Sequence, residues 1–207
     1  SLPVLIRFTD ILKHRLGDIY QAFQAAIAQN QYQGAYSCVY PIKVNQQRHV
    51  VEEIVEFGAE HGVGLECGSK PELQAVLGLN ESANHLIVCN GYKDEEFMRL
   101  ALMGQKLGHP VMVVLEQLNE LDVLLQIADE MGVRSKFGLS AVELMRLLDR
   151  LGELGRKDIL RLVHFHLGSQ ITDIRHVKAA LEEISRYYSE MRGMGFDITH
   201  VDVGGGL

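Results

Sequence analysis

One lysine stands in a setting that suits a nucleophile, in the run Tyr40-Pro41-Ile42-Lys43-Val44-Asn45. The residues just before it are small or β-forming, so Lys43 is expected near the carboxyl end of a strand. Burying an ammonium without a partner is costly, or lowers its pKa toward neutrality. The free amine that results can form an imine with a carbonyl compound. The alternative is a lysine whose stem lies along the protein and whose charge reaches water.

A carboxylate takes the corresponding place in the next strand-like segment, Gly64-Leu65-Glu66-Cys67-Gly68-Ser69. Glu66 is expected at the end of that strand, directly before a glycine turn. Ser69 also fits the N-cap of a helix that starts at Lys70-Pro71. The cap interpretation accounts for Ser69 whether or not Glu66 takes part in chemistry.

Two histidines follow in a late segment, His164-Phe165-His166-Leu167-Gly168-Ser169-Gln170. The two-residue period of a strand places His164 and His166 on one face, most simply inside a barrel. Some metal hydrolases hold zinc with such a pair, although on their first strand rather than a late one. A satisfied core histidine is the other alternative. Gly168 and Ser169 add donors that suit an anion.

The last segment, Asp202-Val203-Gly204-Gly205-Gly206, carries three successive glycines after a strand. Glycines there let backbone N–H groups approach an anion, and barrels often bind phosphate at a late loop. A plain turn is the alternative. Taken jointly, a strand-end lysine, a histidine next to anion donors and a glycine cradle are the parts of a pyridoxal-phosphate site.

The elements that must position these residues recur at regular intervals. Strand-like segments centre near residues 40, 64, 87 and 113, with two more at 160–167 and 198–203. Helical periodicity predicts helices over 10–29, 50–61, 71–79, 94–107, 118–131, 141–154 and 174–193. Such alternation predicts an α/β protein with a parallel sheet, because parallel strands need crossover helices.

The spacing is interrupted once. Between residues 113 and 164 a strand is expected near 132–139, but that run is too charged and glycine-rich, which suggests residues missing between Arg134 and Ser135. We therefore expect a parallel (β/α)₈ barrel that is incomplete at its carboxyl end, with an open doubly wound sheet as the alternative. A leading strand over residues 2–8 and the first helix would form a segment 1–34, before a partial barrel over 35–207.

Composition limits the remaining classes. The 207 residues are 47% hydrophobic and 23% charged, which is typical of a globular protein with a sizeable core. The net charge of −7 argues against nucleic-acid and anionic-membrane partners. No apolar run reaches 18 residues. Three cysteines without C-x-x-C spacing are interpreted as reduced core thiols, so we expect a cytoplasmic protein.

Six runs together resemble the biosynthetic arginine decarboxylases, which belong to the alanine-racemase-like class of pyridoxal-phosphate enzymes. The runs are YPIKVNQ from Tyr40, GLECGSKPEL from Gly64, CNGYKD from Cys89, SKFGLS from Ser135, HFHLGSQ from His164 and VDVGGGL from Val201. The resemblance implies pyridoxal 5'-phosphate held as a Schiff base on Lys43, with His166 stacked on its ring. It makes Ser169, Gly204, Gly205 and Gly206 phosphate donors and Glu66 an acidic catalytic group.

By the same resemblance the reaction is conversion of L-arginine to agmatine and CO₂ in polyamine biosynthesis, by a homodimer or tetramer. Mg²⁺ is a further candidate cofactor, with no ligands assigned. Family members carry further site residues beyond the region matching Leu207, so the chain alone is expected to be inactive. The alternatives are decarboxylation of ornithine, lysine, diaminopimelate or carboxyspermidine, or a non-catalytic barrel homologue.

Overall fold

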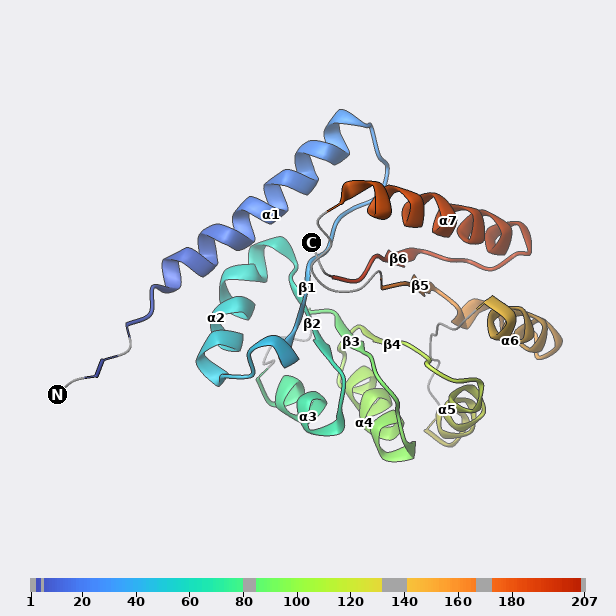
Figure 1. Ribbon diagram of the computed structural model, residues 1–207. Helices are drawn as coiled ribbons and strands as arrows, with labels where there is room; N and C mark the ends of the chain where they lie inside the picture. Colours follow the sequence, from blue (N-terminus) through green and yellow to red (C-terminus); the bar gives the residue numbers. More distant parts are fainter. Residues whose placement is uncertain (1–2, 5, 80–84, 132–140, 167–172, 206–207) are drawn as a thin grey trace. The chain divides into compact units, whose positions relative to one another are not determined.

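The computed structural model describes residues 3–4, 6–79, 85–131, 141–166 and 173–205 (Figure 1). The chain splits into two compact units, Ser1–Cys89 with Met103–Val111, and Asn90–Leu102 with Met112–Leu207. Up to β3 the elements are α1 (Thr9–Gln29), β1 (Val39–Pro41), the 3₁₀ turn η1 (Ile42–Val44), α2 (Arg48–Gly58), η2 (Ala59–His61), β2 (Gly64–Cys67), α3 (Lys70–Leu79) and β3 (Ile87–Cys89). They continue as α4 (Glu95–Lys106), β4 (Val111–Val113), α5 (Leu118–Met131), α6 (Ala141–Glu153), η3 (Lys157–Ile159), β5 (Leu162–His164), α7 (Ile174–Gly193) and β6 (His200–Asp202).

The strands pair in parallel, which confirms the predicted α/β class. One sheet has the order β1-β2-β3-β4, with β1 parallel to β2 and β2 parallel to β3. A second sheet pairs β5 with β6, again in parallel. These described strands form two sheets rather than a closed barrel. The strand expected near residues 132–139 lies outside the described residues.

Most predicted elements form within two residues of their expected limits. The bounds of α5 and α7 coincide with the predictions, and the Asp173 side chain starts α7 by accepting a hydrogen bond from the Arg175 N–H. Strands β5 and β6 are shorter than expected. The predicted leading strand over residues 2–8 is wrong for the described residues, which carry no strand there. Val4, Ile6 and Phe8 are 63 to 70% exposed, because no neighbouring strand in the described part of the chain pairs with this segment.

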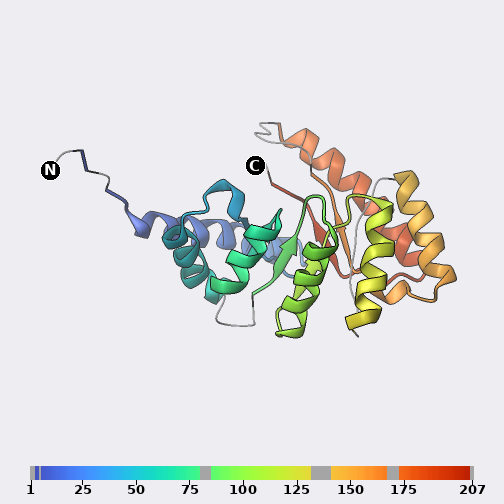
Figure 2. The same ribbon diagram turned by 90° about the horizontal axis from the view of Figure 1, so that it is seen from below.

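In the first unit, β2 lies between β1 and β3 and is buried. Leu65 is fully buried, and its N–H donates to the Leu86 carbonyl at 2.8 Å. A Cβ at Gly64 would lie 2.5 Å from the same carbonyl oxygen, so the glycine lets β3 come close. Helix α1 packs against α2, as Figures 1 and 2 both show.

The two buried cysteines of the first unit meet across β2 and β3. Cys67 and Cys89 are register partners, and their sulfurs lie 3.8 Å apart without a disulfide. The contact with Cys89 and burial raise the pKa of the Cys67 thiol. The cysteines at 38, 67 and 89 are all free, in agreement with the predicted thiols.

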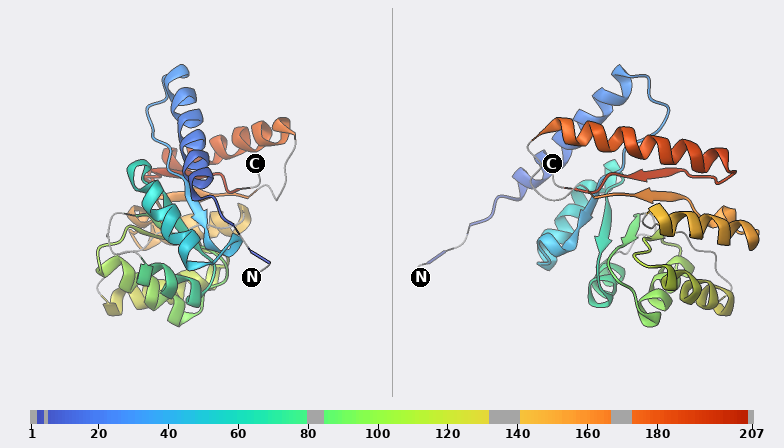
Figure 3. Two further views of the ribbon diagram at one scale, coloured as in Figure 1. Left: turned by 90° about the vertical axis from the view of Figure 1, so that its left-hand side faces the viewer. Right: turned by 45° about the vertical axis from the view of Figure 1, so that its right-hand side comes forward.

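In the second unit, α6 and α7 lie on opposite sides of the β5–β6 pair (Figures 1 and 3). Apolar side chains bury themselves here at helical spacing, including Leu144, Leu147, Leu148 and Leu151 of α6. None of the helices in the described residues combines the length and apolar content that crossing a bilayer requires.

Candidate functional site

Lys43 lies directly beyond the carboxyl end of β1, as predicted. It is the middle residue of the turn η1, which buried Ile42 anchors to the core. The Lys43 side chain is 64% exposed, so the desolvation expected of a lysine inside a strand does not apply in this conformation. The structure therefore presents the amine to solvent at a strand exit.

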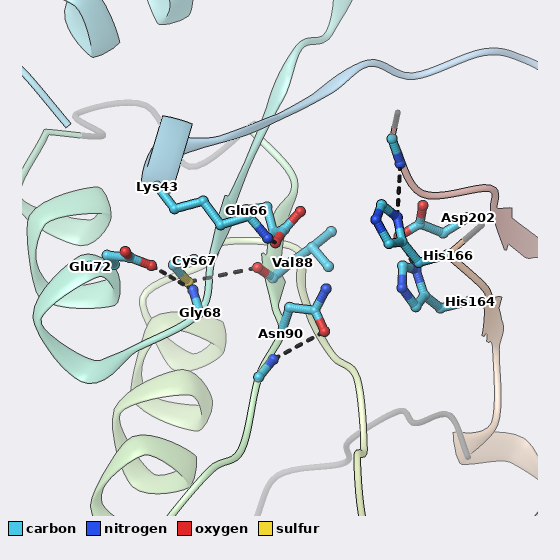
Figure 4. Close-up of polar contacts among 12 residues, drawn as sticks. Lys43, Glu66, Cys67, Gly68, Glu72, Val88, Asn90, His164, His166 and Asp202 are labelled. Carbon is cyan, nitrogen blue, oxygen red and sulfur yellow. Dashed lines mark hydrogen bonds and ion pairs between the residues drawn. The ribbon is translucent and has the colours of Figure 1, made fainter. Parts of the chain in front are cut away.

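Glu66 is the nearest carboxylate to this amine in the described part of the chain. Nζ of Lys43 lies 3.5 Å from Oε1 of Glu66, whose side chain is only 19% exposed (Figure 4). The register that pairs Pro41 with Glu66 sets this proximity, because both residues stand at the carboxyl ends of neighbouring strands. A pair with one solvated partner contributes little stability, about 1 kcal/mol or less. The Glu66 carboxylate can therefore form an ion pair with the Lys43 ammonium or exchange a proton with it.

Glu72 holds the two loops that carry this pair, and the sequence analysis gave it no role. Its Oε2 accepts the Gly68 N–H at 2.7 Å, and its Oε1 accepts the Gln46 amide at 2.9 Å. It thereby connects the turn after β2 with the segment after η1. The available signal was the spacing Ser69-x-x-Glu72, since the Ser69 hydroxyl also accepts the Glu72 N–H at 3.4 Å, as a capping box predicts.

The second unit contains a histidine–aspartate pair between β5 and β6. His164 and Asp202 are register partners, and Nδ1 of His164 lies 2.9 Å from Oδ2 of Asp202. His166, two residues on, accepts the Gly205 N–H at Nδ1 over 3.3 Å, which places its ring proton on Nε2. Both imidazoles thus contact β6 or the turn after it. Their common orientation into a barrel stays a prediction.

Gly204 lies where a side chain does not fit. Its φ is +67°, and a Cβ there would lie 2.6 Å from Nδ1 of His166 and 2.8 Å from the Phe165 carbonyl oxygen. The Gly204 N–H donates to Oδ1 of Asp202 at 2.9 Å. Glycine turns at strand exits can bind phosphate through backbone N–H groups. Here the Gly204 and Gly205 N–H groups donate to Asp202 and His166, so the phosphate role of this turn stays a prediction. Ser169 and Gly206 lie outside the described residues.

A metal ion is the alternative ligand for the two histidines. Within the residues described, no three or more His, Cys, Asp or Glu side chains cluster in a way that could hold a metal ion. The zinc-hydrolase alternative for His164 and His166 therefore has no further ligands to draw on in this part of the chain.

Asp202 is a carboxylate held in its charged form. Burial alone would raise the pKa of Asp202, but the hydrogen bond and charge of His164 together with the Gly204 N–H outweigh it and lower the pKa. A lowered folded-state pKa contributes stability at pH values above the unfolded carboxyl value, and that stability is lost as the pH falls through the folded-state value.

We predict that Asp202→Asn destabilises the complete protein most near pH 6, and that this difference shrinks as the pH falls below about 4. Urea unfolding of both proteins across this pH range measures the difference. In a His164→Gln background the same substitution should cost less, because the partner has already been removed. A difference that stays constant with pH would contradict the role assigned to the pair.

Comparisons with known proteins identify the family. A family model described as "Pyridoxal-dependent decarboxylase, pyridoxal binding domain" matches residues 16–135 and 127–207. Biosynthetic arginine decarboxylases of Marinobacter nauticus and Vibrio vulnificus are each 47% identical over the whole chain, which spans 37% of their length. The crystal structure of the biosynthetic arginine decarboxylase of Campylobacter jejuni matches with a TM-score of 0.93 at 34% identity, covering 97% of this chain and 36% of that one.

The comparisons also bear on the interrupted spacing. The match to the Marinobacter protein extends over 233 positions against the 207 residues of this chain, a difference of 26, so that relative carries additional residues within the matched region. The two family-model matches overlap over residues 127–135, and this range contains the predicted interruption between Arg134 and Ser135. The chain belongs to the pyridoxal-dependent decarboxylases and carries their pyridoxal-binding domain.

Proposed function

We propose that the complete protein carrying this chain decarboxylates L-arginine to agmatine and CO₂, using pyridoxal 5'-phosphate, and that this chain is part of its barrel. The observation that carries the proposal is the Lys43–Glu66 pair at the exits of β1 and β2, in a chain 47% identical along its whole length to two biosynthetic arginine decarboxylases. The two strand exits supply an amine and a carboxylate at the edge where parallel α/β folds bind ligands.

Each proposed residue has its own task. The Lys43 amine would hold the cofactor covalently, and Oε1 of Glu66 lies 3.5 Å from Nζ, within reach to hold or take the proton of that amine. His166 would lie against the cofactor ring, and Ser169 with the turn from Gly204 to Gly206 would bind its phosphate. The bound cofactor supplies an electron-accepting ring that stabilises the charge left when CO₂ departs.

Broader features of the proposal rest on the same family membership. The complete fold is a (β/α)₈ barrel, with residues 1–34 leading into the barrel portion that starts at 35. The protein acts in the cytoplasm, in polyamine biosynthesis, as a homo-oligomer. Mg²⁺ is a second candidate cofactor, and none of the described residues is assigned to it.

We predict that the complete protein releases CO₂ from L-arginine at least about a hundredfold more efficiently than from ornithine, lysine or diaminopimelate, since a site built for a guanidinium leaves polar groups unpaired with the shorter amines. Release of labelled CO₂ from each carboxyl-labelled substrate measures kcat/KM. Lys43→Ala is the control and should reduce all activity to background. A preference for another amino acid would reject arginine as the substrate, and an active Lys43→Ala variant would reject the assignment of the amine.

A paired substitution tests the glycine turn. Gly204→Ala should weaken cofactor binding by about tenfold or more, because a side chain at φ +67° is strained and would displace His166. Gly193→Ala at the end of α7 is the matched control, since a Cβ there meets no atom within 4 Å and the residue lies outside the proposed site, so its affinity should stay close to wild type. Titration of apoprotein with pyridoxal phosphate measures both. Equal affinities for the two variants would contradict the assigned geometry.

A further inference from the structure

The run Cys89-Asn90-Gly91-Tyr92-Lys93-Asp94, which has no role in the proposed chemistry, contributes the lysine of a fully buried ion pair. The side chains of Lys93 and Glu120 are 0% and 1% exposed, and Nζ lies 3.8 Å from Oε1. Lys93 stands in the loop after β3, and Glu120 in the first turn of α5, after β4. Two neighbouring strands of the sheet are therefore followed by loops that meet at one buried pair.

Glu120 satisfies backbone groups of both loops. Its Oε1 accepts the Lys93 N–H at 2.7 Å, and its Oε2 accepts the N–H groups of Glu116 and Gln117 at 2.6 and 3.1 Å. Nζ of Lys93 donates to the Gly91 carbonyl. One carboxylate thus fixes the chain direction in the loop after β3 and in the loop after β4.

The loop after β3 has a second connection to its neighbour. The Gly91 N–H lies 3.1 Å from Oε1 of Glu116, while it also contacts the Asn90 side chain at 3.0 Å. Gly91 adopts φ +70°, a conformation that needs glycine. The segment from Asn90 to Lys93 is consequently held in one conformation by contacts on both sides.

The energetics favour a positioning role over a stabilising one. Removing two charges from water costs about as much as their attraction returns, so a buried ion pair rarely stabilises a fold more than two apolar side chains of the same size would. The carboxyl edge of a parallel sheet is where ligands bind, and there a loop displaced by about 1 Å can cost a hundredfold in rate.

We propose that Lys93 and Glu120 are positioning residues, which lock the β3–α4 loop to the β4–α5 loop so that Asn90 and Gly91 keep a fixed place at the ligand-binding edge. The inference rests on the proposed function for its link to catalysis. Its structural part, a loop held by the buried pair, stands independently of that function.

The decisive variant of the complete protein is Lys93→Met with Glu120→Leu, which replaces the pair by apolar side chains. Lys93→Met leaves the buried Glu120 carboxylate without its cation, and Glu120→Leu leaves the Lys93 ammonium without its carboxylate and three backbone N–H groups without an acceptor. Each single variant should lower the Tm by about 10 °C. The double variant should regain only the part of that loss that comes from the unpaired charge, because the three N–H groups still lack an acceptor. Its amides at 90–93 and 116–117 should nevertheless exchange with deuterium about tenfold faster, and its KM for arginine should rise by about tenfold.

A double variant with normal stability, loop exchange and KM would overturn the proposal. A double variant whose Tm stays as low as that of the single variants, while its loop exchange and KM are normal, would overturn it too. If that variant does not fold, Lys93→Met with Glu120→Gln keeps one acceptor oxygen and provides the same measurements. Arg99→Gln with Glu130→Gln is the matched control, because this exposed pair also joins α4 to α5, at 2.6 Å, and should change neither readout. A wild-type protein without arginine decarboxylase activity would reject the proposed function and leave the exchange measurement to judge the loop.

Discussion

The parallel register of β1 against β2 is the constraint on which the candidate site depends. Val39, Tyr40 and Pro41 face Gly64, Leu65 and Glu66 in turn, which brings the Glu66 carboxylate within 3.5 Å of the Lys43 amine just beyond the strand. A slip of one residue would turn Glu66 to the opposite face of the sheet. On its other side, β2 packs closely against the start of β3, because Gly64 has no Cβ to hinder the approach of Leu86.

A common device holds the loops that follow the strands. Glu72 accepts the Gly68 N–H after β2, Glu120 accepts three N–H groups after β3 and β4, and Asp202 accepts the Gly204 N–H after β6. Loops lack the ladder partners of a strand, so their buried N–H groups need other acceptors. Carboxylates make stronger hydrogen bonds than neutral acceptors. A carboxylate side chain also fixes a loop without backbone hydrogen bonds between that loop and the edge of the sheet.

Sequence patterns predicted the elements better than the contacts between them. Helices α5 and α7 have the predicted bounds because apolar periodicity and flanking residues act over a few positions. The apolar residues of the segment 2–8 also follow a regular pattern, but no strand in the described part of the chain pairs with this segment. The pattern was therefore misleading there. The sequence pointed to three residues because charged side chains and glycines are unusual next to buried strands. These residues are Lys43, Glu66 and Gly204.

The long-range contacts of these acids could not be predicted, since register and helix packing bring the partners together: Gln46 with Glu72, Lys93 with Glu120, and His164 with Asp202. His164 and Asp202, for example, are 38 residues apart and meet only because β5 pairs with β6 in one particular alignment. Local sequence patterns therefore identify the reactive residues at the carboxyl ends of the strands. Strand pairing and helix packing determine how the loops that follow those strands are held.

The most direct test of the central claim is borohydride reduction of the complete protein after pyridoxal phosphate has been added, followed by mass-spectrometric mapping of the modified peptide. We expect one pyridoxyl group per chain, on Lys43. Modification of a different lysine, or none at all under conditions where the protein is folded, would contradict the assignment of the β1 exit as the place where the cofactor is held.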